Sequence, residues 1–151
     1  MKHSFFIVFL TSLLFITGLS SFAPGETNNL DKDVLMETNT FRKSKGKADL
    51  QMNAELNAIA EQHSINMANG KVAFGHAGFE KRNKLASSGS IHIISFAENV
   101  AFGAPTAKEV VIMWKNSPGH RTNMLGNYKY IGVGTARDKN GRIFYTQVFA
   151  G

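Results

Sequence analysis

Apolar residues recur at helical spacing in two stretches of the first half of the chain. The first stretch predicts a helix over 31–42 with Asp31 as its N-cap. The second predicts a helix from the N-cap Asn53 to about residue 68, because Asn69-Gly70 is a typical helix end. Both patterns indicate amphipathic helices that turn one apolar face toward a core.

The middle of the chain predicts shorter elements separated by glycine-rich loops. A short helix is expected around 80–85, and a strand over 91–96 that runs on toward residue 101. Thr106 begins a third amphipathic helix over about 107–116. Ser117-Pro118-Gly119 ends that helix, and a helical turn is expected around 120–125.

In the last part of the chain, apolar and polar residues alternate as they do in the two strands of a β-hairpin. Two strands are predicted over 130–137 and 142–149, joined by Asp138-Lys139-Asn140-Gly141. Asn-Gly favours a tight turn between antiparallel strands. Helical patterns followed by a terminal hairpin, without internal repeats, indicate an α+β protein.

The N-terminus has the pattern of an export signal. Lys2 provides a positive charge, residues 5–19 are nearly all apolar, and small residues precede a cleavage site expected after Ala23. An uncleaved membrane anchor is the alternative for this segment. The predicted organisation is a signal peptide over 1–23, a polar lead-in over 24–29 and one domain over 30–151.

Composition is consistent with one exported, globular domain. The 151 residues are 43% hydrophobic and contain no cysteine, so the fold does not depend on disulfides. Cleavage after Ala23 would remove Lys2 and lower the net charge from +6 to +5, which still favours acidic surfaces such as phospholipid headgroups or cell-wall polymers. The basic residues are scattered along the chain, which is typical of solvated surface charge and argues against a nucleic-acid partner.

Six short segments follow one another along the chain: Asn39-Thr40-Phe41-Arg42, Ala60-Glu61-Gln62-His63-Ser64, Gly75-His76, Ala97-Glu98-Asn99-Val100-Ala101, Trp114-Lys115-Asn116-Ser117-Pro118-Gly119-His120-Arg121 and Ile131-Gly132-Val133-Gly134. Together, and in this order, they resemble the CAP superfamily (cysteine-rich secretory protein, antigen 5 and pathogenesis-related 1; the SCP domain). The resemblance implies an α-β-α sandwich, with a short antiparallel sheet between helical layers and a cleft on one face. Because the chain has no cysteine, it resembles the short bacterial type of the family.

Two departures from the family pattern affect the expected site. Ala97 stands where the family usually has glycine before Glu-Asn. Asn116 and Ser117 follow the tryptophan where long eukaryotic members place a second cleft glutamate. A full set of two histidines and two glutamates is therefore not implied for this chain.

By resemblance, His76, Glu98 and His120 correspond to the cleft residues of the family. Two imidazoles and a carboxylate are able to bind zinc or another divalent metal with one position open to water, or to act as general base and acid. A structural role for Glu98 is the alternative. Glu109 is a fourth candidate for the cleft, and an outer position near the positive end of its helix is the other interpretation.

Several other conspicuous residues have structural interpretations. His63 lies on the apolar face of its predicted helix, which indicates a buried histidine with satisfied hydrogen bonds rather than a ligand. Ser64 beside His63 suggests a nucleophile, but no acid is placed to complete a catalytic triad. Trp114 is expected in the core, and Gly132 and Gly134 are expected to admit a helix close to the sheet.

These observations lead to an exported binding module, extracellular or periplasmic, as the first hypothesis. The resemblance implies a lipid or sterol-like ligand or a protein partner, with no stable membrane anchor once the signal is cleaved. The alternative is a metal-dependent hydrolase of peptides or cell-wall material, with His76, Glu98 and His120 holding the metal. A scaffold recognised through its loops is a third hypothesis. No residue is assigned a catalytic role.

Overall fold

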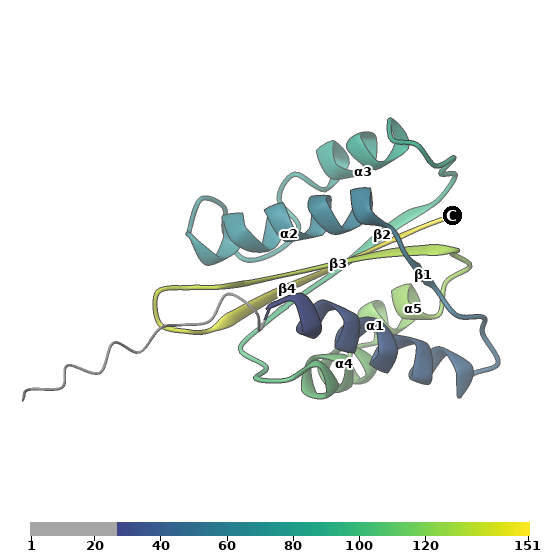
Figure 1. Cartoon of the computed structure of the whole chain (residues 1–151), viewed down its shortest axis with the longest axis horizontal. Helices are drawn as coiled ribbons and strands as arrows, with labels where there is room; N and C mark the ends of the chain where they lie inside the picture. Colours follow the sequence, from purple (N-terminus) through teal and green to yellow (C-terminus); the bar gives the residue numbers. More distant parts are fainter. Residues whose placement is uncertain (1–26) are drawn as a thin grey trace, which may run out of the picture.

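The computed structural model describes residues 27–151, with side chains from Leu30 onward, so the predicted signal peptide lies outside the described residues. Two helical layers enclose one sheet within this range (Figure 1). The elements are α1 (Thr27–Lys43), β1 (Gln51–Met52), α2 (Ala54–Ala68), α3 (Phe79–Ser87), β2 (Phe96–Phe102), α4 (Ala107–Asn116), α5 (Pro118–Met124), β3 (Tyr130–Arg137) and β4 (Ile143–Ala150).

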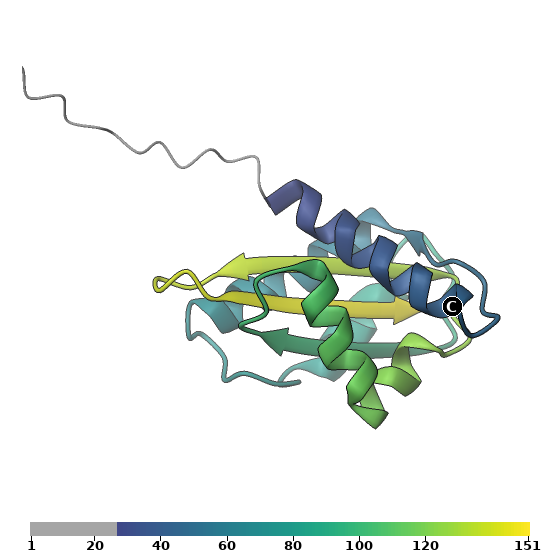
Figure 2. The same cartoon turned by 90° about the horizontal axis from the view of Figure 1, so that it is seen from below.

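The sheet has the strand order β1-β3-β4-β2, so β2 forms one edge. β4 pairs antiparallel with both β3 and β2, while the two-residue β1 runs parallel to β3. Helices α2 and α3 lie on one face, and α1, α4 and α5 lie on the other (Figures 1 and 2). The predicted α+β sandwich is confirmed, and the parallel β1 is an addition to its antiparallel sheet.

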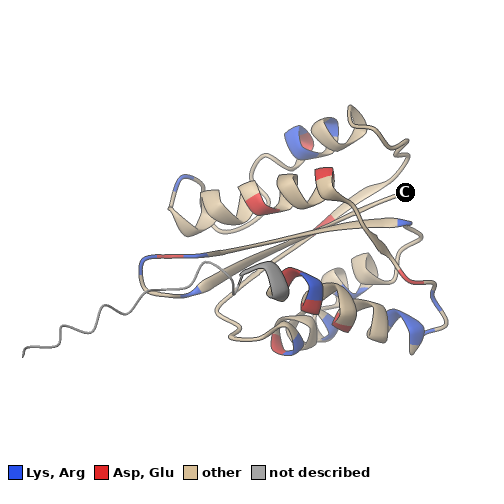
Figure 3. Cartoon of the chain, viewed as in Figure 1, with Lys and Arg blue, Asp and Glu red and all other residues tan. Residues whose placement is uncertain are grey.

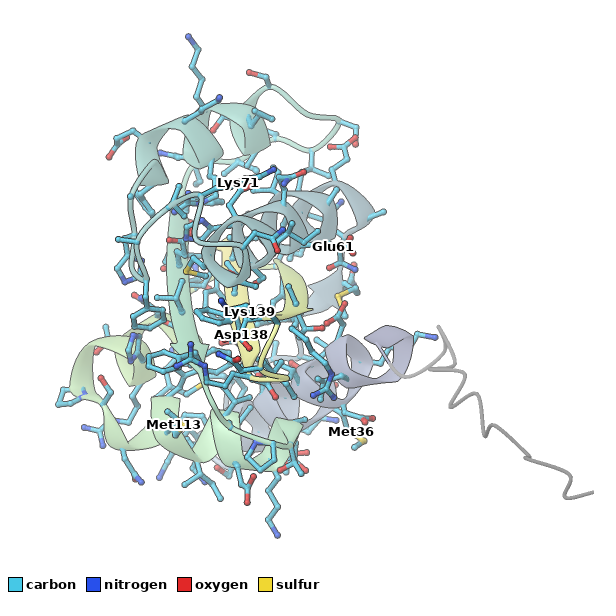
Figure 4. The ribbon with its side chains drawn as sticks, turned by 90° about the vertical axis from the view of Figure 1, so that its left-hand side faces the viewer. Met36, Glu61, Lys71, Met113, Asp138 and Lys139 are labelled. Atoms are coloured by element: carbon cyan, nitrogen blue, oxygen red, sulfur yellow. The ribbon has the colours of Figure 1, made fainter. Side chains whose placement is uncertain are left out.

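The terminal hairpin forms as predicted. β3 spans the expected residues and β4 begins at Ile143, one residue later than expected. The Gly141 N–H donates to the Asp138 carbonyl at 2.9 Å, and Gly141 has a φ of 79°, which glycine adopts without strain. Viewed toward the hairpin end, Asp138 and Lys139 lie between the layer bearing Glu61 and the layer bearing Met113 (Figure 4).

Two helices begin at the N-caps that the sequence predicts. The Leu56 N–H donates to the Asn53 side chain at 3.0 Å, and the Glu109 N–H donates to the Thr106 hydroxyl at 3.3 Å. Each cap satisfies one of the amide groups that have no partner within the helix. The starts of α2 and α4 are therefore determined by local sequence.

Two predicted boundaries are wrong. α1 begins at Thr27 rather than at Asp31, because Leu30 extends the apolar stripe by one turn and packs against the core. Asp31 is thus inside the helix and is not its cap. β2 begins at Phe96 rather than at residue 91, since the N–H groups of Ile94 and Ser95 both donate to the Gly151 carbonyl instead of to a neighbouring strand.

The larger apolar cluster lies between the sheet and the layer of α1, α4 and α5. Trp114 is 1% exposed in this cluster, and its indole N–H donates to the Val100 carbonyl at 3.2 Å. Its predicted place in the core is confirmed. Arg42 is also buried, and its guanidinium donates to the carbonyls of Ala48, Met124 and Gly126.

On the opposite face, the backbone of α2 lies directly on β3. A Cβ atom at Gly132 would collide with the backbone of Leu56, and one at Gly134 with the backbone of Glu61. Both glycines admit the helix as predicted. This contact fixes the position of α2, which lines the candidate site described below.

Surface charge is spread over the molecule. Lys and Arg residues lie on both helical layers and on the hairpin, interspersed with Asp and Glu (Figure 3). None of the helices within residues 27–151 combines the length and the apolarity needed to cross a bilayer.

Candidate functional site

The centre of the candidate site is a pair of neighbouring residues on the edge strand β2. Successive side chains of a strand point to opposite faces of the sheet. Glu98 accordingly contacts residues of α2 and α3, whereas Asn99 contacts residues of α5 and the sheet. The Glu98 side chain is fully buried, with 0% exposure, so its charge requires partners inside the protein.

Arg82 and His76 provide those partners. The guanidinium of Arg82 contacts both carboxylate oxygens of Glu98, with Nε at 2.5 Å from Oε2 and Nη2 at 2.7 Å from Oε1. The His76 Nδ1 lies 2.8 Å from Oε1. Two parallel bonds from a guanidinium to a carboxylate are among the strongest polar contacts in proteins. We call Glu98, Arg82 and His76 the Glu98 cluster.

His76 lies in the loop between α2 and α3, and its side chain is 49% exposed. Because a carboxylate only accepts hydrogen bonds, the bond to Glu98 places the ring proton on Nδ1 and leaves Nε2 as an acceptor. Gly78, at the start of α3, has a φ of 79°, which turns the chain from the loop into the helix. The helix then directs Arg82 back toward Glu98.

His63 of α2 is buried beside this cluster. Its Nε2 donates to the Gly75 carbonyl at 2.9 Å and lies 3.9 Å from Glu98 Oε1. Burial lowers the pKa of His63, and the charge of Arg82 adds to that effect, so the ring is neutral near pH 7. The predicted buried, hydrogen-bonded histidine is confirmed, and it also forms one wall of the Glu98 cluster.

His120 is positioned from the other face of β2. The Asn99 side chain donates to the His120 carbonyl at 3.1 Å and accepts from Asn123 at 2.9 Å. Burial lowers the pKa of His120, and the charge of His76 lowers it further. His76 and His120 thus flank β2 from opposite layers.

Two other candidates lie apart from the cluster. Glu109 is exposed in the first turn of α4, where its carboxylate accepts from the Thr106 hydroxyl at 3.2 Å. That turn is at the opposite end of α4 from α5, which bears His120. Ser64 is buried, and its hydroxyl donates to the Gly134 carbonyl, so it is not exposed to a substrate.

The residues expected to hold zinc do not fit a metal in this arrangement. Catalytic zinc sites use three protein ligands with free lone pairs. Both oxygens of Glu98 are bound by Arg82, so only the Nε2 acceptor of His76 and the imidazole of His120 remain from the three expected ligands. Within residues 27–151, no group of three or more His, Cys, Asp or Glu side chains is arranged to hold a metal ion.

A groove of about 420 Å³ lies between α2 and α3, directly beside the Glu98 cluster. Its surface is mainly apolar, and Lys81 lies at its α3 side together with Arg82. Pockets for small molecules typically combine apolar walls with a few polar groups that orient the ligand. The groove is lined by Ala58, Ile59, Gln62, His63, Asn66, Val72, Ala77, Gly78, Lys81, Arg82 and Leu85.

Sequence reasoning missed Arg82 and the groove. Arg82 lies 16 residues before Glu98, in a short polar helix without strong periodicity. Its position one turn after Gly78 was the available signal, because a helix that starts there points that residue back toward the loop with His76. The groove depends on the packing of two helices and has no local signal.

Comparison with known proteins agrees with the family that the sequence motifs resemble. The family model that matches residues 35–149 is described as the Cysteine-rich secretory protein family, CAP. The uncharacterized protein YkwD of Bacillus subtilis strain 168 is 34% identical over 138 residues, which cover 89% of this chain and 52% of that protein. The chain therefore spans about half the length of the curated relative it matches.

Solved structures share the fold. An extracellular protein containing a SCP domain from Bacillus anthracis has a TM-score of 0.71 and 24% identity, covering 82% of this chain and 41% of that one. A cysteine-rich secretory protein from Staphylococcus aureus has a TM-score of 0.69 and 22% identity, covering 85% and 40%. An outer surface protein from Borrelia burgdorferi has a TM-score of 0.66 and 20% identity, covering 79% and 90%.

Proposed function

The chain belongs to the cysteine-rich secretory protein (CAP) family, and from that premise we propose that it is an exported module that binds an amphipathic ligand with an acidic head group. Support for a location outside the cytoplasm comes from the apolar segment over 5–19 and from similar proteins described as extracellular or outer-surface. The groove beside the Glu98 cluster is the observation on which the ligand proposal rests.

The walls of the groove favour an apolar chain. Ile59 of α2, Leu85 of α3 and Val72 of the intervening loop contribute aliphatic surface, and Leu85 is 52% exposed. Each methylene group that moves from water into such a groove contributes about 0.8 kcal/mol to binding. A volume of about 420 Å³ is within the range of ordinary small-molecule sites.

The charge at the groove favours an anion at the head of that chain. Lys81 and Arg82 line it, and its lining includes no carboxylate. Lys81 is exposed, and within the described residues it takes part in no ion pair. An acidic head group therefore meets an uncompensated positive charge, whereas a cationic one is repelled.

We would test the ligand class by titrating the protein with palmitate and with hexadecanol, which has a chain of the same length but no charge. We expect saturable binding of palmitate, and weaker binding of hexadecanol. Leu85→Asp adds a polar, negative side chain to the groove and is expected to raise the Kd for palmitate at least about tenfold.

Met113→Asp is the matched control, because Met113 is 46% exposed on α4, in the other helical layer. It is expected to leave palmitate binding unchanged. An absence of saturable binding, or an equal loss in the two variants, would rule out the groove as the site. Stronger binding of hexadecanol than of palmitate would contradict the acidic head group.

A further inference from the structure

The negative charge of Glu98 is neutralised by a side chain of the protein itself. Its two oxygens receive three hydrogen bonds, two of them from the Arg82 guanidinium, and the carboxylate is completely shielded from water. The Arg82 side chain is itself only 12% exposed. We propose that Arg82 occupies the place of a metal ion in the Glu98 cluster, so that the cluster excludes divalent metals.

The loop carbonyls fix Arg82 in this position. Its Nη1 donates to the Ala77 carbonyl at 2.8 Å, and its Nη2 contacts the His76 carbonyl at 3.4 Å in addition to Glu98. A Cβ atom at Gly78 would approach Nη1 to 3.3 Å, so the loop closes around the guanidinium. Every nitrogen of the side chain therefore contacts an oxygen of this loop or of Glu98.

A divalent cation has no direct access to Glu98 while Arg82 remains. The cation would have to displace the guanidinium from a buried carboxylate, and the displaced charge would repel it at short range. Without Glu98, only the imidazoles of His76 and His120 remain from the expected ligand set, and zinc sites of catalytic type require three protein ligands. This inference is independent of the ligand proposed for the groove.

Zinc titration by calorimetry tests the proposal on the wild-type protein and on Arg82→Met. Wild type is expected to show no saturable site in the micromolar range. Arg82→Met leaves the Glu98 oxygens exposed to a cation and is expected to bind one zinc ion at least about 100-fold more tightly. Adding His76→Ala to Arg82→Met is expected to abolish that gain.

Lys81→Met is the matched control for zinc binding, because it removes the neighbouring positive charge without touching Glu98, and it is expected to bind zinc no better than wild type. Arg82→Gln removes the charge but keeps a hydrogen-bond donor, and it replaces Arg82→Met if that variant does not fold. A micromolar one-to-one zinc site in wild type that His76→Ala removes would overturn the proposal. Folded Arg82 variants that bind zinc no better than wild type would also overturn it.

Discussion

Glu98 and Asp31 are two carboxylates removed from water in different ways. Glu98 is surrounded by Arg82 and His76, and both its oxygens are bound. Asp31 of α1 lies against Thr135 of β3, where neither Asp31 Oδ1 nor the Thr135 hydroxyl has a partner in normal hydrogen-bond geometry. Burial raises the pKa of Asp31 to about 6, a rise that the Thr135 hydroxyl opposes and the charge of Glu61 assists.

The comparison shows that burial alone does not decide the charge of a carboxylate. A guanidinium that binds both oxygens stabilises the anion, whereas a neighbourhood with only a hydroxyl and another acid favours the proton. Replacing each carboxyl group by its amide is therefore expected to have opposite effects in the two places.

The largest effect is expected at Glu98. Glu98→Gln removes the charge that compensates Arg82 and weakens three hydrogen bonds, so we expect a loss of about 3 kcal/mol in the free energy of unfolding. Urea denaturation near neutral pH measures this loss. Glu109→Gln is the control, since the exposed Glu109 accepts only one side-chain bond, and its effect is expected to stay within about 0.5 kcal/mol. Equal losses in the two variants would contradict the assigned role of Glu98.

A smaller effect is expected at His76. His76→Ala removes one hydrogen bond from Glu98 but leaves both bonds of Arg82, so we expect a loss of about 1.5 kcal/mol. His92→Ala, at an exposed position outside the cluster, is expected to change stability much less in the same denaturation experiment. A loss as large as that of Glu98→Gln would show that His76 is the principal partner of the carboxylate instead of Arg82.

The smallest effect is expected at Asp31, and its sign depends on pH. The folded pKa of about 6 is above the ordinary value of 3.8, so the folded protein binds a proton that the unfolded chain has lost between these values. The contribution of Asp31 to stability is therefore complete below about pH 4 and is lost as the pH rises through 6.

Asp31→Asn removes this dependence. The variant is expected to match wild type near pH 4 and to exceed it by about 1 kcal/mol above pH 6, less than the full pKa shift implies because Asp31 is only partly buried. Urea denaturation at both pH values measures the difference. If Asp31→Asn is less stable than wild type at the higher pH, the Asp31 anion has a stabilising partner.

The parts of the fold that were predicted correctly are those determined by residues close together in the sequence. The caps Asn53 and Thr106 and the turn at Gly141 act within a few residues, and the elements they begin or join lie where expected. The early start of α1 depends on Leu30 meeting a core formed by distant segments. β1 is only two residues long and is defined by its pairing with β3, so no local sequence pattern predicts it.

The candidate site likewise has residues that the sequence predicted and one, Arg82, that it did not. The resemblance to the family pointed to His76, Glu98 and His120, and the structure brings His76 and Glu98 into direct contact. The role of Arg82 requires that α3 fold back over the end of β2, which only the tertiary structure shows. The sequence-based expectation of zinc binding and the proposed exclusion of metals by Arg82 predict opposite results in the zinc titration.

Glu98 and Asn99 are consecutive residues of β2, and they connect the two helical layers through the backbone of this strand. They share one peptide bond but contact opposite helical layers, Glu98 through Arg82 and Asn99 through Asn123. The peptide unit between them is also held directly, because the Glu98 carbonyl accepts from the Asn123 side chain at 3.1 Å. Residues of the two helical layers therefore meet on one short stretch of edge-strand backbone, which is held from both faces of the sheet.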